Sequence, residues 1–212
     1  MTGLKIYGTA RSRTARVLWM ATELGLPFEH TPLTMGDGAL KQPPFLKINP
    51  AGRVPAIDDN GFAMSESLAI NLYLARKYGE RATPSLAPAS LEEEAKIWRW
   101  SCWALTDLEI PLNTIHLHRN FFPPDKRDAK AAEDAEAQVQ RPLAMLDKVL
   151  AESPYLLGSR FTVADLNVAC VLSASRLSAI DIAAFPQVAD WAKRCHERPA
   201  SLAVQAMRKA DA

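Results

Sequence analysis

The loop between residues 7 and 16 carries side chains that could stabilise a negatively charged sulfur atom. Hydroxyl and guanidinium groups gather there, and Ser12 and Arg11 are the most prominent of them. The loop precedes a predicted helix, and the positive end of a helix dipole lowers the pKa of a nearby thiol. The segment therefore predicts an electropositive thiolate site, although a solvated helix start with Ser12 as its N-cap is an alternative.

A proline at the start of a predicted strand could open the main chain to a ligand. Pro55 follows Val54 within residues 53–56, and proline lacks the N–H that an inner strand position requires. If the Val54–Pro55 bond is cis, the N–H and C=O of Val54 turn outward and can pair with an extended peptide. A trans proline at a strand start is the alternative.

A third segment could bind both charges of an amino-acid end. Ser65, Glu66 and Ser67 precede a predicted helix, whose free N–H groups and dipole favour an anion. Ser67 adds a hydroxyl donor for a carboxylate, and Glu66 could hold an ammonium group. Plain N-capping with an acidic first turn is the alternative.

The elements that must position these segments form a small α/β unit. Apolar periodicity and turn residues predict strands at 4–8 and 28–33, a helix at 12–24, a hairpin around 58–61, and a helix from its cap at Ser65 to Tyr78. Residues 34–52 are predicted as a loop that ends in a turn cluster. The order of these elements indicates a mixed sheet.

Only helical patterns follow residue 80. Residues 80–89 contain prolines and are predicted as a linker between a first domain over 1–79 and an all-helical domain over 90–212. Helices are predicted at 90–120, 126–151 and 162–178, and from Pro186 to an end at Arg198-Pro199. The first and third begin with capping boxes, Ser90 with Glu93 and Thr162 with Asp165.

Composition argues against several classes of protein. The 212 residues include 25 basic and 24 acidic side chains, a net charge of +1, which gives no sign of nucleic-acid binding. No apolar run approaches the roughly 20 residues of a membrane span. Three separated cysteines without a CxxC motif favour a reduced, cytoplasmic setting. His116 and His118 form the only close histidine pair, and without nearby Cys or carboxylate ligands we expect no metal site.

Together the three segments resemble the glutathione-binding core of cytosolic glutathione transferases. Residues 49–56 (NPAGRVPA) and 64–70 (MSESLAI) carry the resemblance, and residues 161–165 (FTVAD) resemble the capping box of the family's helical domain. The opening segment, residues 7–19, is similar to bacterial and plant members that use serine, of theta and phi type. The resemblance covers essentially the whole chain.

The resemblance implies a thioredoxin-like first domain with a four-stranded mixed sheet and a cis Pro55, followed by a helical bundle. Glutathione is then the co-substrate, and no cofactor is bound permanently. The Val54 main chain would pair with the cysteinyl part of glutathione. Glu66 and Ser67 would hold its γ-glutamyl end.

Three further residues receive roles from the same resemblance. Lys41 would reach the glycine carboxylate of glutathione. Arg53 stands where many members carry glutamine, so a side-chain contact is implied there. Asp165 is implied to be a structural residue rather than a catalytic one.

Several groups are candidates for stabilising the thiolate. Ser12 is the first choice, as the serine of the loop after the first strand. The loop is one residue shorter than in plant members, so Arg11 would take the catalytic position in an alignment without a gap. Thr9, Tyr7 or a main-chain N–H are further alternatives. No cysteine lies in the loop, which argues against mixed-disulfide chemistry.

The second substrate is expected to lie against the first helix of the second domain. Trp103, Thr106, Asp107 and Ile110 recur at helical spacing, and we assign Trp103, Thr106 and His116 to a hydrophobic substrate site. An aromatic stripe with this spacing is also typical of a helix core.

The predicted function is therefore glutathione transfer to a small hydrophobic electrophile, a detoxification reaction, by a protein that the resemblance implies is a homodimer. Alternatives within the family are a glutathione-binding regulatory or chaperone-like protein without turnover, a peroxidase, an isomerase or a dehalogenase. Outside it, a two-domain protein that uses its tryptophans for protein contacts is a further alternative.

Overall fold

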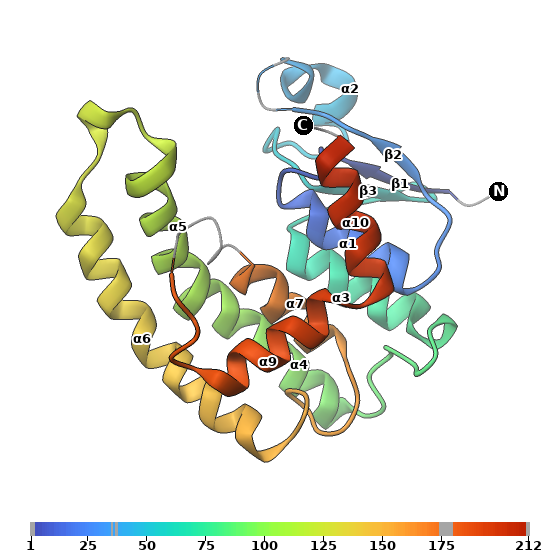
Figure 1. The fold of residues 1–212 in the computed structure, drawn as a ribbon. Coiled ribbons are helices and arrows are strands. Elements are labelled where there is room, and N and C mark those ends of the chain that lie inside the picture. The colour runs from blue at the N-terminus through green and yellow to red at the C-terminus, as the bar shows by residue number, and fades with distance from the viewer. Residues whose placement is uncertain (1–2, 35, 37, 174–179, 211–212) are drawn as a thin grey trace. The chain divides into compact units, whose positions relative to one another are not determined.

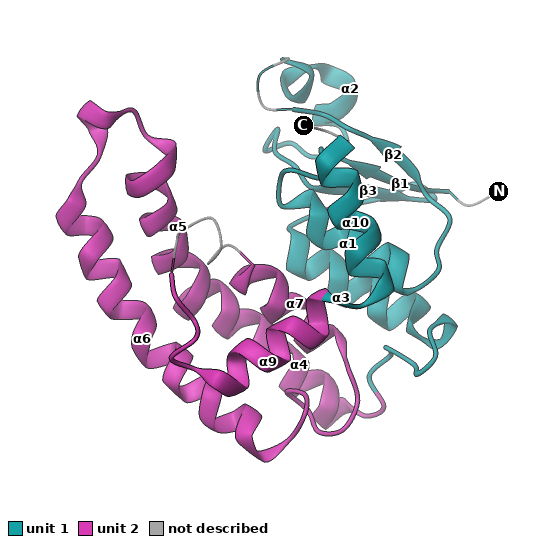
Figure 2. Ribbon diagram, in the orientation of Figure 1, with its two compact units in different colours: residues 1–88, 197–212 teal, residues 89–196 magenta. Residues whose placement is uncertain are grey.

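The computed structural model describes residues 3–34, 36, 38–173 and 180–210. The chain divides into two compact units, one formed by residues 1–88 and 197–212 and the other by residues 89–196 (Figure 2). Residues 197–212 were predicted as part of the helical domain, whereas their contacts group them with the first unit.

A mixed four-stranded sheet in the order β2-β1-β3-β4 forms the centre of the first unit (Figure 1). Its strands are β1 (Leu4–Tyr7), β2 (Glu29–Thr31), β3 (Ala56–Asp59) and β4 (Phe62–Ser65). β1 runs parallel to β2 and antiparallel to β3, and β4 runs antiparallel to β3. The predicted fold class, a thioredoxin-like α/β part followed by a helical part, is confirmed.

The hairpin between β3 and β4 turns at Asn60 and Gly61, as predicted. Both residues have positive φ angles, 55° and 90°. A two-residue type I′ turn requires this conformation, and Asn-Gly adopts it at little steric cost. The Gly61 N–H also donates to the Asp58 carboxylate at 2.7 Å, which closes the turn.

Asp59 joins this hairpin to α3 (Ser67–Tyr78), the helix that begins at the predicted carboxylate site. Its buried carboxylate accepts hydrogen bonds from Tyr73 Oη at 2.7 Å, Lys77 Nζ at 2.7 Å and Tyr78 Oη at 2.9 Å. Burial is the largest single influence and would raise the pKa of Asp59, but the three hydrogen bonds together lower that pKa below its ordinary value. The helix is thereby anchored to the sheet.

Two more helices complete the first unit. α1 (Thr14–Glu23) packs against both α3 and α10 (Pro199–Ala210). Arg198, just before α10, donates to both carboxylate oxygens of Glu23, at 2.7 and 2.8 Å. The helix α10 was not predicted, because Arg198-Pro199 was interpreted only as a helix end. Pro199 instead occupies the first helical position, where its missing N–H has no intrahelical partner to lose.

Two local predictions in the first unit were wrong. Residues 39–46, predicted as loop, contain a 3-10 turn (Ala39–Lys41) and the short helix α2 (Pro43–Leu46). The helix α2 begins with two prolines, which the opening positions of a helix tolerate. Ser65 does not cap α3, because β4 continues through Ser65 and Glu66 takes the N-cap position.

The second unit opens with a helical stretch that runs from residue 91 to residue 121. It consists of α4 (Leu91–Trp103), a π-helical segment (Ala104–Glu109), α5 (Ile110–His116) and a second π-helical segment (Leu117–Phe121). Pro111 has no N–H to donate to the carbonyl of Asp107, and the first π-helical segment, whose turns are wider than those of an α-helix, lies directly before this proline. The predicted helix at 90–120 is thus present with two local irregularities.

Three further helices in this unit are α6 (Ala129–Glu152), α7 (Val163–Leu172) and α9 (Pro186–His196). The predicted end of the third helix, at residue 178, lies outside the described residues. None of the described helices has an apolar stretch long enough to cross a membrane.

Asp165, predicted as a structural residue, is fully buried in the first turn of α7. Its Oδ2 accepts from the N–H and the hydroxyl of Thr162, at 2.9 and 3.0 Å. Its Oδ1 accepts from the Leu156 N–H at 2.9 Å and from Trp191 Nε1–H at 3.0 Å. One carboxylate therefore connects α7 both to the segment before it and to α9.

Candidate functional site

Ser12 lies in the turn between β1 and α1, and its side chain is partly buried. Its Oγ lies 2.9 Å from the Thr9 carbonyl oxygen and 2.9 Å from Thr14 Oγ1. The Thr14 N–H donates to the same Oγ at 3.1 Å. Ser12 Oγ therefore accepts a hydrogen bond from the first residue of α1, and its own proton has two acceptors within reach, the Thr9 carbonyl and Thr14 Oγ1, from which a stronger acceptor could draw it.

The rival groups of this loop have different surroundings. Arg11 is exposed to solvent, and Thr9 contributes its carbonyl as the acceptor for Ser12. The Tyr7 ring packs edge-on against Phe45 with 5.8 Å between ring centroids. Burial is the main cause that raises the pKa of the Tyr7 hydroxyl, which makes it a weaker acid than a free tyrosine. Tyr7 is thus a packed strand residue.

The Val54–Pro55 peptide bond is cis. Among the described residues, no hydrogen bond is formed by the N–H or C=O of Val54, which lies two residues before β3. The preceding turn is held by buried Asn49, whose Nδ2 donates to the Arg53 carbonyl at 2.7 Å. A short piece of main chain next to the end of β1 is therefore available for an extended ligand.

Lys41 and Arg53, the two predicted cationic contacts, are both exposed. Gly52 lies next to Lys41, because a Cβ built at Gly52 would lie 2.8 Å from Lys41 Nζ and 2.8 Å from the Leu40 carbonyl oxygen. The φ of Gly52 is 60°. The turn before Arg53 and the 3-10 turn that ends at Lys41 are thus packed backbone to backbone, which places the Lys41 ammonium beside this turn.

Gly52→Ala is expected to lower the free energy of unfolding by about 1–2 kcal/mol from the left-handed conformation alone, and further through the clash with Leu40. Gly38→Ala is the matched control, since Gly38 has a φ of 76° but an added Cβ would meet no atom within 4 Å. Urea unfolding of both variants measures the difference. Equal losses of stability would contradict the close packing at Gly52.

Glu66 and Ser67 lie together where β4 joins α3, as predicted. Glu66 is exposed and adopts a φ of 73°, whereas Ser67 is buried as the first residue of α3. Arg16 Nη1 donates to Ser67 Oγ at 3.3 Å, and Arg16 is itself only 8% exposed. A buried guanidinium, a hydroxyl and the positive end of a helix dipole therefore meet at one point, an arrangement that favours a carboxylate.

Arg16 is the residue of this cluster for which no role was predicted from the sequence. It was counted only among the basic residues of the first loop. It lies in α1, and the 51 positions between it and Ser67 leave no local pattern that joins them. Only the pairing of α1 with α3 brings the two side chains together.

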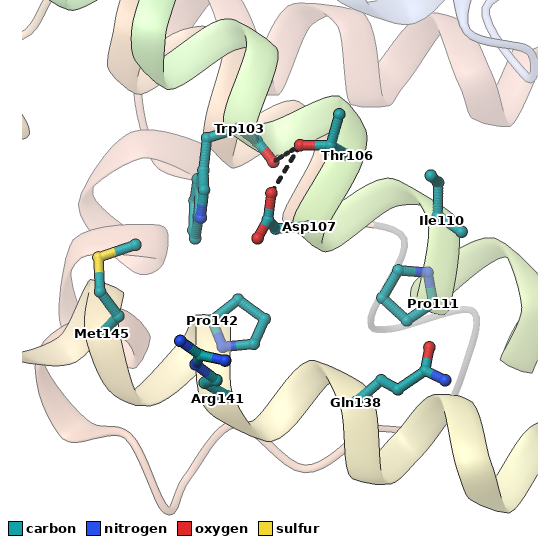
Figure 3. A pocket seen from close by; sticks show the side chains of 9 residues that line it. All are labelled: Trp103, Thr106, Asp107, Ile110, Pro111, Gln138, Arg141, Pro142 and Met145. Carbon is teal, nitrogen blue, oxygen red and sulfur yellow. Dashed lines mark hydrogen bonds between the residues drawn. The ribbon is translucent and has the colours of Figure 1, made fainter.

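In the second unit, Trp103 and Thr106 line one pocket of about 470 Å³, which lies between the helical stretch 91–121 and α6 (Figure 3). Pro142 and Met145 of α6 add apolar surface, while Asp107 and Arg141 add opposite charges. Thr106 Oγ1 donates to Asp107 at 2.6 Å. The pocket therefore combines an indole wall with polar groups.

His116, the third predicted member of the hydrophobic site, does not line this pocket. Its Nδ1 is buried and has no hydrogen-bond partner in the described structure, and its ring lies 6.2 Å from that of Phe121. In the part of the chain that the structure describes, no group of three or more His, Cys, Asp or Glu side chains could hold a metal ion.

Comparison with known protein families gives two matches along the chain. Residues 2–76 match the description "Glutathione S-transferase, N-terminal domain". Residues 111–199 match "Glutathione S-transferase, C-terminal domain". The first match contains all the predicted glutathione contacts, and the second contains the Asp165 capping box.

Curated relatives include a glutathione S-transferase 3 of Zea mays, which is 32% identical over 215 residues and covers 94% of this chain and 92% of its own length. The glutathione S-transferase hmp2 of Hypomyces subiculosus is 36% identical over 169 residues, with 77% of this chain and 78% of that protein covered.

Solved structures with the same fold include glutathione transferase F2 of Populus trichocarpa, with a TM-score of 0.88, 27% identity, and coverage of 98% of this chain and 99% of that one. A theta-class glutathione S-transferase from Xanthomonas axonopodis pv. citri, solved with glutathione bound, has a TM-score of 0.85 and 29% identity, and covers 96% and 97%.

Proposed function

Since this chain belongs to the glutathione S-transferase family and is a glutathione transferase, we propose that its first unit binds glutathione between the Val54 main chain and the start of α3. The observation that carries this proposal is the meeting of Arg16, Ser67 and the N-terminus of α3. These groups suit the γ-glutamyl carboxylate of glutathione, and exposed Glu66 suits its ammonium group.

The other predicted contacts extend the same binding mode along the tripeptide. The N–H and C=O of Val54 pair with the cysteinyl residue, since the described chain offers them no other partner. Lys41 binds the glycine carboxylate from beside Gly52, and Arg53 adds a second cation at this end. The orientation runs from α3, at the γ-glutamyl end, to the 3-10 turn of Lys41, at the glycine end.

Ser12 is proposed as the group that stabilises the thiolate. A free thiol has a pKa of about 8.5, so only a few per cent is ionised at neutral pH. A hydrogen bond to a charged acceptor contributes about 1.5–3 kcal/mol, which corresponds to roughly one to two pKa units. The start of α1 adds up to about 1 kcal/mol through its dipole. These two effects suffice to make the thiolate the dominant form.

The reaction then follows from the ionised sulfur. The thiol proton leaves to solvent, and a sulfur lone pair forms a bond to an electrophilic carbon. In a substitution, the leaving group departs with the electron pair of its broken bond. In an addition, the π electron pair of the attacked double bond moves onto the neighbouring atom of the electrophile. We propose Trp103 and Thr106 as contacts for the electrophile, and the charges of Asp107 and Arg141 favour an aromatic electrophile with polar substituents.

Ser67→Ala tests the proposed binding mode. Loss of one hydrogen bond to a charged group is expected to weaken glutathione binding by about 10- to 100-fold. Titration calorimetry of glutathione into the purified variant measures the affinity. Ser65→Ala is the control, because the Ser65 hydroxyl has no hydrogen-bond partner among the described residues. An unchanged affinity of Ser67→Ala would place the carboxylate elsewhere.

Turnover separates the transferase from the other members of the family. Purified protein with glutathione and a generic aryl halide should release halide at a rate that depends on protein concentration. Retention on glutathione resin without turnover would favour a regulatory or chaperone-like protein. Turnover only with hydroperoxides, with isomerisable substrates or with alkyl halides would favour a peroxidase, an isomerase or a dehalogenase.

We also propose that the protein is a cytoplasmic homodimer of the serine-using, theta- or phi-like type. Three large apolar side chains, Leu91, Trp98 and Leu105, recur every seven residues along one helical stretch and are 77%, 50% and 42% exposed. Apolar side chains in this pattern suit a partner helix. Sedimentation of the purified protein measures the oligomeric state.

A further inference from the structure

Thr14 is a fully buried side chain that has no role in the binding mode described above. It is the first residue of α1, two positions after Ser12. We propose that Thr14 is a positioning residue that makes Ser12 a donor-only group, and so makes Ser12 selective for the thiolate over the neutral thiol. The inference rests on the proposed role of Ser12 and deepens it.

The assignment follows from the number of hydrogen bonds that the Ser12 hydroxyl can donate and accept. A serine hydroxyl donates one hydrogen bond and accepts two. Ser12 Oγ has three partners within 3.1 Å, namely the Thr9 carbonyl, the Thr14 N–H and Thr14 Oγ1. The carbonyl can only accept and the N–H can only donate. Thr14 Oγ1 is therefore the one partner whose direction is open.

The surroundings of Thr14 decide that direction. Its hydroxyl proton has two acceptors among the described residues, Ser12 Oγ at 2.9 Å and the Tyr7 carbonyl at 3.4 Å. O–H···O hydrogen bonds are usually about 2.5–3.0 Å long, so the 3.4 Å contact to the Tyr7 carbonyl is the weaker of the two. When Ser12 donates to another acceptor, the Thr14 proton is best placed on Ser12. Both acceptor positions of Ser12 are then filled by one residue.

Because Thr14 fills both acceptor positions of Ser12, it determines which form of a bound thiol Ser12 can recognise. A thiolate accepts the Ser12 proton once that proton leaves the Thr9 carbonyl. A neutral thiol could instead donate its S–H to an open lone pair of Ser12, and this bond would favour the neutral form. Hydrogen bonding to the charged form lowers a pKa, and hydrogen bonding to the neutral form raises it. By filling the lone pairs, Thr14 leaves only the first possibility.

Gly8 is the residue that allows this arrangement. A Cβ built on Gly8 would lie 2.1 Å from Thr14 Oγ1, closer than two such atoms can approach. Gly8 also has a φ of 118°, which side-chain-bearing residues rarely adopt. The backbone after β1 thus leaves space for the Thr14 hydroxyl beneath Ser12, where full burial excludes competing water.

Thr14→Val removes the hydroxyl and keeps the branched shape. We expect the pKa of enzyme-bound glutathione, followed by thiolate ultraviolet absorbance, to rise by about half to one unit, so that turnover below this pKa falls by about three- to tenfold. Turnover at a pH above the shifted pKa should return to the level of the unmodified protein, and glutathione affinity should stay the same. A purely structural defect would lower turnover at every pH.

Two further variants make the comparison specific. Thr14→Ser keeps the hydroxyl and should restore the thiol pKa, whereas Thr14→Ala should behave like Thr14→Val; this pair replaces Thr14→Val if that variant does not fold. Thr22→Val is the matched control in the same helix, since the one hydrogen bond of the Thr22 hydroxyl to a described residue is to the Leu18 carbonyl, at 2.7 Å. It should leave the thiol pKa unchanged.

The double variant Ser12→Ala/Thr14→Val distinguishes this inference from the proposal on which it rests. If Thr14 acts through Ser12, the double variant should have the same thiol pKa as Ser12→Ala alone. An unshifted pKa in Ser12→Ala would overturn the role of Ser12 itself. A shifted pKa in Ser12→Ala together with an unshifted one in Thr14→Val would overturn only the role of Thr14, and additive shifts would show that Thr14 acts independently.

Discussion

Replacing Asp165 with alanine is expected to lower the free energy of unfolding by about 3–5 kcal/mol, the range for breaking a buried charged network by removal of one partner. The carboxylate is fully buried and accepts four hydrogen bonds, from Leu156, Thr162 and Trp191. Its removal leaves four buried donors without an acceptor. Since whole domains are stable by only about 5–15 kcal/mol, we expect much of this variant to accumulate in unfolded form.

Urea unfolding followed by tryptophan fluorescence measures this loss. Asp128→Ala is the matched control, since the exposed Asp128 carboxylate caps α6 by accepting one hydrogen bond from the Ala131 N–H, at 3.0 Å. Loss of such a cap costs about 1 kcal/mol. If Asp165→Ala is no more damaging than Asp128→Ala, the buried hydrogen bonds of Asp165 contribute little to stability.

Ser12→Ala is expected to raise the pKa of bound glutathione by about one to two units and to lower turnover near neutral pH by about 10- to 100-fold. The hydroxyl lost is the donor proposed for the thiolate. Glutathione affinity should change little, because Ser67 and Arg16, the groups proposed to bind the γ-glutamyl end, are left intact by this substitution. A pH profile of kcat with an aryl halide, together with the thiolate absorbance, separates the two effects.

Arg11→Ala is the informative companion to this variant. Arg11 is exposed, and surface charges act weakly through solvent, so its removal should shift the thiol pKa far less than Ser12→Ala does. The reverse ranking, a large shift for Arg11→Ala and none for Ser12→Ala, would transfer the role of thiolate donor to Arg11.

Much of the fold follows from short-range signals in the sequence. The hairpin turn at Asn60-Gly61 and the capping box of Thr162 with Asp165 each depend on residues within four positions of one another, so local reasoning found them. The grouping of Glu66 with Ser67 at a helix start was predicted for the same reason. These signals do not depend on tertiary contacts, because caps satisfy nearby backbone N–H groups and turn residues fit the φ angles that the turn requires.

The features that were not predicted depend on tertiary contacts. The bond between Arg16 and Ser67 joins two helices, and α10 is grouped with the first unit although it follows the second in the chain. The short helix α2 was also missed, because it has only four residues and begins with two prolines, a residue type that both ends helices and begins them. The local sequence pattern cannot show whether a proline ends or begins a helix, since packing against distant segments determines which of the two conformations is stable.

The position of α10 has a consequence for biosynthesis. Because α1 packs against α10 and Glu23 is held by Arg198, the first unit lacks part of its own structure until Arg198 and α10 have been translated. During translation, the side of α1 that contacts α10 therefore stays uncovered while the helices of the second unit emerge from the ribosome.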